Sequence, residues 1–126
     1  LPVMQTDLML SREEKVLIID AKYYEHTTRV QYGKHKLHSD NLYQIFTYVK
    51  NKEYELKDQP HEVAGMLLYA RTEEKIQPDQ KYMMSGNWIC VRTLDLNLDF
   101  TEIRKQLDGI VEEYFEEADK FSESES

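Results

Sequence analysis

The chain has 126 residues, of which 40% are hydrophobic and 11% aromatic, enough for one folded domain with one hydrophobic core. No apolar run is as long as a membrane span and no signal peptide opens the chain, so we expect a cytoplasmic protein that does not enter the membrane. The net charge of −8 does not exclude a nucleic-acid partner, because residues 99–126 carry ten acidic and three basic side chains and the rest is nearly neutral.

Two strands are predicted near the start of the chain. Residues 3–10 alternate between two faces, and residues 16–19 form a continuous aliphatic run typical of a strand buried on both faces. A short polar connection, Ser11–Glu14, separates them, so we expect an antiparallel hairpin. A more polar excursion over residues 23–37, with a turn at Gly33, is expected next. Basic side chains in the stretch from Glu25 to His38 are candidates for contact with DNA phosphates: Arg29, Lys34, Lys36 and His38.

A helix is predicted after this excursion. Ser39 or Asp40 can cap its first turn, and it is expected to run to about Lys52. Apolar side chains recur at the i, i+3, i+4 and i+7 positions of one helical face: Leu42, Ile45, Phe46 and Val49. This stripe marks the face that packs against the rest of the fold.

Two further strands are predicted in the second half of the chain. Residues 63–69 are almost wholly apolar and indicate a second buried strand. Residues 88–96 alternate in the manner of a strand, and Cys90 within them is expected to be a small buried hydrophobic residue. The stretch between the two strands, which contains Pro78, is expected to be a loop.

A capping box formed by Asp99 and Glu102 begins the last helix. Its buried stripe is expected to comprise Phe100, Ile103, Leu107, Ile110, Val111 and Tyr114. Residues 121–126 repeat Ser and Glu and are expected to form a polar acidic tail after a domain that spans residues 1–120. The order of elements predicts an α/β fold of the α+β kind, with a central mixed β-sheet flanked by helices.

The second predicted strand ends in an acid and a base on one face. Side chains alternate along a strand, so Asp20 and Lys22 project together, about 7 Å apart along the backbone. In an apolar strand they must be paired, hydrated or bound to a metal. Asp7 can be brought opposite them by the hairpin. Two carboxylates at one point favour a divalent cation such as Mg²⁺, with the backbone carbonyl of Ala21 as a further ligand.

Phosphodiester hydrolysis requires such a set of groups. A metal ion neutralises the phosphate and lowers the pKa of a bound water, and a cation such as Lys22 holds the attacking water and stabilises the developing charge. The simpler alternative is an ion pair between Asp20 and Lys22 at a strand end, since the pattern Asp-x-Lys is common. Gln44 and Tyr48 lie at i and i+4 on the predicted helix, on one flank beside its apolar stripe.

Three segments in this order carry a resemblance: Met4–Asp7, Leu17–Tyr24 and Asp40–Tyr48. They resemble the PD-(D/E)xK nucleases with the RecB-like QxxxY motif and, more narrowly, the McrC nuclease subunits of McrBC-type modification-dependent restriction systems. The likeness covers roughly residues 3–96. It implies a restriction-endonuclease-like core that cleaves DNA with Mg²⁺, for which Mn²⁺ can substitute. The resemblance implies that Asp7 and Asp20 bind the metal ion and that Lys22 serves the attacking water. It also implies that Gln44 helps to orient the site and that Tyr48 is a supporting residue.

The resemblance also implies partners besides DNA. McrC-like subunits work with a separate AAA+ GTPase motor that recognises the target, and this chain contains no phosphate-binding Gly-x-x-x-x-Gly-Lys loop. Family members usually have a helix before the first acidic strand, so a chain that begins at Leu1 is expected to be a fragment of a longer protein. A dimer is left open.

Other functional readings remain beside the nuclease. A catalytically silent module that keeps the nuclease fold for DNA binding or subunit assembly is the main alternative. Residues that serve only a phosphate and a metal do not separate DNA from RNA, or a phosphodiester from a monoester. A zinc site at His26, His35 and His38 is disfavoured, because no second cysteine is present and the spacing matches no compact zinc module.

Overall fold

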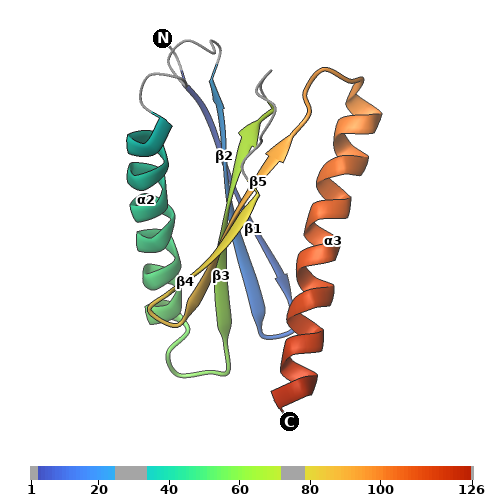
Figure 1. Ribbon diagram of the computed structural model, residues 1–126. Coiled ribbons are helices and arrows are strands. Elements are labelled where there is room, and N and C mark those ends of the chain that lie inside the picture. Colours follow the sequence, from blue (N-terminus) through green and yellow to red (C-terminus); the bar gives the residue numbers. More distant parts are fainter. Residues whose placement is uncertain (1–2, 25–33, 72–78, 126) are drawn as a thin grey trace. The chain divides into compact units, whose positions relative to one another are not determined.

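The computed structural model describes residues 3–24, 34–71 and 79–125 (Figure 1). Its elements in chain order are β1 (Val3–Arg12), β2 (Lys15–Tyr24), α2 (Lys34–Glu55), β3 (Glu62–Ala70), β4 (Gln80–Met84), β5 (Asn87–Leu94) and α3 (Phe100–Glu125). The chain divides into two compact units, Leu1–Thr93 and Leu94–Ser126. Among the helices that the structure describes, none combines the length and the apolar character that crossing a membrane requires.

The first unit is built on a five-stranded sheet with the order β1-β2-β3-β5-β4. Strands β1 and β2 are antiparallel, β2 and β3 are parallel, and β4 and β5 are antiparallel. The sheet is therefore mixed, and with the helices it makes an α+β fold consistent with a restriction-endonuclease-like core. The predicted fold class is confirmed.

The hairpin of β1 and β2 fixes the register of the first two strands. Glu13 begins the turn between them with φ 59°, the left-handed backbone conformation that tight hairpin turns require. The antiparallel register pairs Arg12 with Lys15 at the turn and Asp7 with Asp20 further along. The expected antiparallel pairing of these two segments is confirmed.

A crossover through α2 joins the parallel strands β2 and β3. The start of α2 and the carboxyl ends of both strands lie at the same end of this β–α–β unit (Figure 1). Ile45 and Val49, on the predicted apolar stripe of α2, are fully buried. They belong to a cluster of buried side chains from the helix and the sheet: Val16, Ile18, Ile45, Val49, Val63, Leu67, Tyr69, Ile89 and Val91.

Gly65 of β3 allows α2 to approach the sheet closely. A Cβ atom at this position would lie 2.6 Å from Cγ1 of Ile45 and 3.0 Å from Cγ2 of Val49, closer than side-chain carbons pack. The separation of helix and sheet is therefore set by the missing side chain of Gly65.

Polar contacts join the last turns of α2 to the β4–β5 hairpin. Lys50 Nζ donates to the carbonyl of Ser85 at 2.8 Å. Asn87 Nδ2 donates to Glu53 Oε2 at 2.8 Å and to the carbonyl of Val63 at 2.9 Å. The hydrogen bond from Asn87 is the main cause that lowers the pKa of Glu53, with Lys50 adding to it, while burial acts in the opposite direction.

The structure corrects two predicted boundaries in the first unit. Helix α2 begins at Lys34, so Ser39 and Asp40 lie inside it and do not cap it. The apolar stripe reveals only the helical turns that face the core, and the polar turns before it carry no such signal. Strand β4 occupies part of the stretch predicted to be a loop, and Ser85 and Gly86 form its turn to β5 with φ 47° and 86°.

The second unit consists of a short connection and α3. Asp99 Oδ1 accepts a hydrogen bond from the backbone N–H of Glu102 at 2.9 Å, which confirms Asp99 as the N-cap. Strand β5 ends at Leu94 and does not reach Leu96 as predicted, because Gln106 takes up the backbone N–H of Asp95 at 2.8 Å and its carbonyl at 3.0 Å.

One further prediction for α3 is wrong. Phe100 is predicted to be buried, but it is the first residue of the helix and is 77% exposed. The backbone is helical over residues 121–125, within the segment expected to be a polar tail. Glutamate is a good helix former and no Gly or Pro interrupts this stretch, so its polar composition does not prevent helical hydrogen bonding.

Candidate active site at the ends of β2 and β3

Asp20 and Lys22 lie on the face of β2 that packs toward α2. They share this face with Ile18, since the three residues stand two apart along the strand, and Ile18 belongs to the buried cluster that includes Ile45 and Val49 of the helix. Asp20 is fully buried, Lys22 is 3% exposed, and Lys22 Nζ lies 3.1 Å from Asp20 Oδ2. The expected shared face is confirmed, and the acid and the base form a buried ion pair.

Gln44 and Tyr48 of α2 extend this pair. Lys22 Nζ donates a hydrogen bond to Gln44 Oε1 at 2.8 Å, and Gln44 Nε2 donates to the hydroxyl of Tyr48 at 3.2 Å. The ammonium group of Lys22 is thus held between the carboxylate of Asp20 and the amide of Gln44. The structure brings together four residues that the sequence singled out, from a strand and from the helix that follows it.

Asp7 enters the site through the strand register. Its Cα is paired with that of Asp20, and Ala21 is paired with Thr6 of β1 and Leu68 of β3. The side chain of Asp7 lies outside the described residues. Within the part of the chain that is described, no three His, Cys, Asp or Glu side chains gather into a metal cage. The donors at hand, a carboxylate and backbone carbonyls, are the hard oxygen ligands that suit Mg²⁺, which needs only one or two carboxylates.

The predicted DNA-contacting residues lie where side chains are not described. Arg29 and His26 fall outside the described residues. Lys34, His35, Lys36 and His38 belong to the first turns of α2, of which only the backbone is described. Their roles toward DNA, and the zinc alternative, therefore remain predictions.

A second polar pair, which the sequence did not reveal, lies beside the ion pair. Asn41 Nδ2 donates to the hydroxyl of Tyr69 at 2.7 Å, and the two residues are 8% and 9% exposed. Tyr69 is paired with Lys22 in the register of β2 and β3, and Asn41 precedes Gln44 by about one helical turn. An amide and a phenol on otherwise apolar faces could have been matched in advance, because buried polar groups find partners.

Comparison with known proteins identifies the family of the chain. Residues 3–70, which contain all of the residues above, match the family described as McrBC 5-methylcytosine restriction system component. The chain is also 34% identical over 115 residues to the Type IV methyl-directed restriction enzyme EcoKMcrBC of Escherichia coli strain K12, covering 90% of this chain and 31% of that protein. It therefore spans about a third of the length of this relative. The chain belongs to the McrBC restriction system component family.

Proposed function

We propose that this chain is the DNA-cleaving core of a McrBC-type restriction system, a metal-dependent endodeoxyribonuclease of the PD-(D/E)xK superfamily. The observation that carries the proposal is the contact of the buried pair Asp20 and Lys22 with Gln44 at one end of a β–α–β unit. A buried ion pair offsets its desolvation poorly, so replacing it by apolar residues is often neutral or stabilising. Retention of these charges within an apolar strand is better explained by chemistry than by stability.

Asp7 and Asp20, with the backbone carbonyl of Ala21, would hold Mg²⁺ or Mn²⁺. Residues directly opposite in an antiparallel pair share one face of the sheet, and Asp7 and Asp20 are paired in this way. When bound, such an ion neutralises phosphate charge and lowers the pKa of a coordinated water. The proposed contribution of the chain is the strand pairing that sets Asp7 opposite Asp20.

Lys22 is the residue to which we assign the role of holding the attacking water. An ammonium has three N–H donors; in this site one is donated to Gln44, and the Asp20 carboxylate lies 3.1 Å away as the ion-pair partner. A further donor can hold the water or the scissile phosphate and stabilise the negative charge that develops on it. Gln44 keeps the ammonium in place, and Tyr48 fixes the orientation of the Gln44 amide by accepting from its nitrogen.

Recognition of the target and the motor activity are proposed to come from a separate protein. The family name refers to 5-methylcytosine, and the EcoKMcrBC relative is described as methyl-directed. We therefore propose methylated DNA as the substrate and an AAA+ GTPase as the partner that selects and engages it. Basic residues at the start of α2, Lys34 and Lys36 among them, are the proposed contacts to DNA phosphates.

The proposal is tested by Lys22→Ala in the assembled enzyme, with supercoiled plasmid carrying 5-methylcytosine, Mg²⁺, GTP and the motor protein. Cleavage should fall roughly a hundredfold or more, about 3 kcal/mol of transition-state stabilisation, while DNA binding is retained. Lys22→Arg should be nearly as inactive, because a planar guanidinium cannot take the place of a compact ammonium. Lys105→Ala, which removes an exposed lysine of α3, is the matched control and should cleave like the wild type.

Wild-type cleavage by a well-folded Lys22→Ala protein would reject the catalytic assignment and favour a silent nuclease-fold module. Metal binding is tested separately by calorimetric titration with Mn²⁺ in the presence of uncleavable DNA, because substrate phosphates complete open sites of this kind. Asp20→Ala should abolish the heat of binding, and Asp58→Ala, at an exposed position, should not. Equal binding by the Asp20 variant would remove the metal from the proposal.

A further inference from the structure

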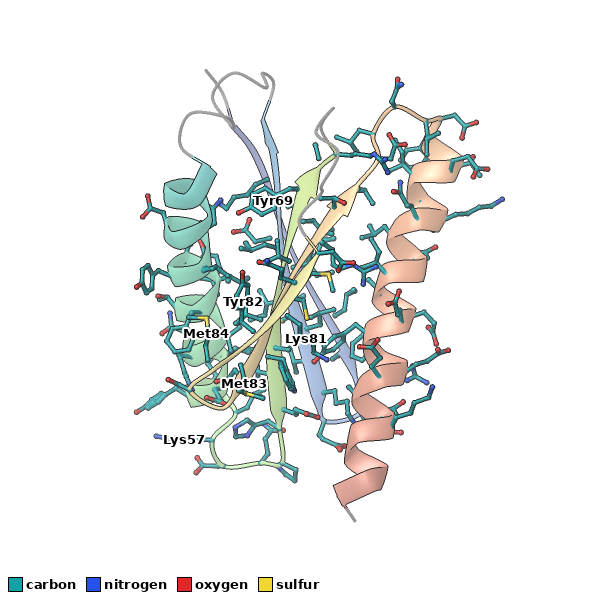
Figure 2. The ribbon with its side chains drawn as sticks, viewed as in Figure 1. Lys57, Tyr69, Lys81, Tyr82, Met83 and Met84 are labelled. Carbon is teal, nitrogen blue, oxygen red and sulfur yellow. The ribbon has the colours of Figure 1, made fainter. Side chains whose placement is uncertain are left out.

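We infer that Asn41 and Tyr69 form a positioning pair that holds the Gln44 turn of α2 over the Lys22 ammonium. The inference rests on the proposed function only for its effect on cleavage, since the positioning itself is a property of the fold. Neither residue is expected to touch the substrate, because both are buried. Figure 2 shows Tyr69 between the sheet and α2, and Asn41 Nδ2 reaches its hydroxyl from the helix at 2.7 Å.

The pair connects the two elements that build the site. Tyr69 lies beside Lys22 in the parallel register of β3 and β2, so its backbone position is fixed by the same ladder that carries the lysine. Asn41 and Gln44 are three residues apart and therefore neighbours on the helix surface. The hydrogen bonds Asn41–Tyr69 and Lys22–Gln44 thus run in parallel from one turn of helix to adjacent strands.

Among the described side chains, α2 approaches the sheet most closely where Ile45 and Val49 face Gly65. Lys22 and Tyr69 lie four residues further along their strands than this point of closest approach. A hydrogen bond requires its donor and acceptor to stay within about 3 Å and near linearity. The Asn41–Tyr69 bond therefore fixes the distance between α2 and the sheet at this point more narrowly than dispersion contacts do. The consequence is a fixed distance from Gln44 Oε1 to Lys22 Nζ.

The experiment deletes the Tyr69 hydroxyl and observes Lys22 directly. In Tyr69→Phe the ¹⁵N–¹H signal of the Lys22 ammonium, assigned by its absence in Lys22→Arg, should shift and its protons should exchange with water roughly tenfold faster, because the contact with Gln44 is loosened. Cleavage should show a kcat between about tenfold and a hundredfold lower with an unchanged KM, the effect expected for a misplaced catalytic group. Asn41→Ala should behave alike, and the double variant should be no worse than either single one.

Tyr82→Phe is the matched control. Tyr82 is labelled beside α2 in Figure 2, packs against the same buried cluster, and donates its hydroxyl to Gln80 on the edge strand β4. Loss of this hydroxyl should leave the Lys22 signal and kcat unchanged. A Lys22 signal or a kcat that changes in Tyr69→Phe and not in Tyr82→Phe therefore reflects a change at the site. A melting temperature that falls in both variants reflects only a loss of packing.

The outcomes separate this inference from the proposed function. An unchanged Lys22 signal in a folded Tyr69→Phe protein overturns the inference, whether or not kcat falls, because any loss would then not act through Lys22. If Lys22→Ala cleaves like the wild type, the proposed function fails, and a displaced Lys22 signal in Tyr69→Phe still supports the positioning pair. If Lys22→Ala is inactive and Tyr69→Phe is fully active with an unchanged signal, only the inference is lost.

Discussion

Replacement of Gly65 by alanine is expected to move α2 away from the sheet and to weaken both fold and site. The added methyl group would lie 2.6 Å from Cγ1 of Ile45, 3.0 Å from Cγ2 of Val49 and 3.2 Å from Cδ1 of Ile89. Carbon atoms pack favourably at about 3.5–4.0 Å, so the helix must retreat by about 1 Å at Ile45. Gly65 does not have a positive φ, so the backbone itself accepts alanine.

The size of the effect follows from two opposing contributions. Adding a methyl group to a well-packed core costs about 1–3 kcal/mol, whereas restricting the unfolded chain by Gly→Ala returns about 0.4–1 kcal/mol. The net result is a protein about 1–2 kcal/mol less stable, since overpacking exceeds the entropic gain. Gln44 directly precedes Ile45, so the same displacement lengthens its 2.8 Å hydrogen bond with Lys22.

Urea unfolding provides the assay. The midpoint should fall while the slope with denaturant is unchanged, because the area exposed on unfolding is nearly the same. In an Ile45→Ala background, which removes the atom that the new methyl group meets most closely, Gly65→Ala should be clearly less destabilising, because only the longer approaches to Val49 and Ile89 remain. A double-mutant cycle measures this coupling. Gly109→Ala in α3 is the control, because no atom lies within 4 Å of the added Cβ, and it should stabilise by up to about 1 kcal/mol.

A Gly65→Ala protein with the wild-type midpoint would refute this reasoning. It would mean that helix and sheet can separate by the required distance at no cost, so that Gly65 does not set their spacing. Destabilisation that persists unchanged in the Ile45→Ala background would also contradict it, since the collision partner would then lie elsewhere.

Two further predictions concern the polar contacts. Because the pKa of Glu53 is below its ordinary 4.5 in the folded protein, its contribution to stability is complete above that value and is lost as the pH falls through the folded pKa. Urea midpoints of the wild type should therefore drop more steeply on acidification than those of Glu53→Gln, and parallel curves would argue against the role of Asn87. Asp99→Ala removes the N-cap of α3 and should cost about 1 kcal/mol, with Asp99→Asn nearly neutral; equal losses in both would exclude capping.

The buried elements of the fold could be predicted from the sequence because burial leaves a periodic signal. The run at residues 16–19, the stripe at Ile45 and Val49 and the strand at residues 63–69 are all identified by where their apolar side chains recur. Strand β4 has no such signal, since an edge strand of five residues packs little of its surface. Its turn, Ser85-Gly86, was readable in the sequence, because a Ser-Gly pair is a turn signal and adopts positive φ here.

The candidate site was predictable to the extent that strand alternation governs it. Asp20 and Lys22 had to share a face, and hairpin pairing had to bring Asp7 near. The contacts from Lys22 to Gln44 and from Asn41 to Tyr69 depend on how a helix is seated on a sheet, which no local pattern encodes. The close approach of Gly65 and Ile45 sets the position of α2 on the sheet. A glycine within an apolar strand indicates such a close approach only weakly.

The turn at Glu13 has a consequence for loop length. Asp7 and Asp20 are equally far along the chain from the two-residue turn that joins β1 to β2, so the turn alone decides that they are paired. Insertion or deletion of a single residue there would slip the strands by one position and send one acid to the opposite face. A surface loop of this kind usually tolerates insertions, whereas in this protein its length is tied to the pairing of Asp7 with Asp20 midway along the hairpin.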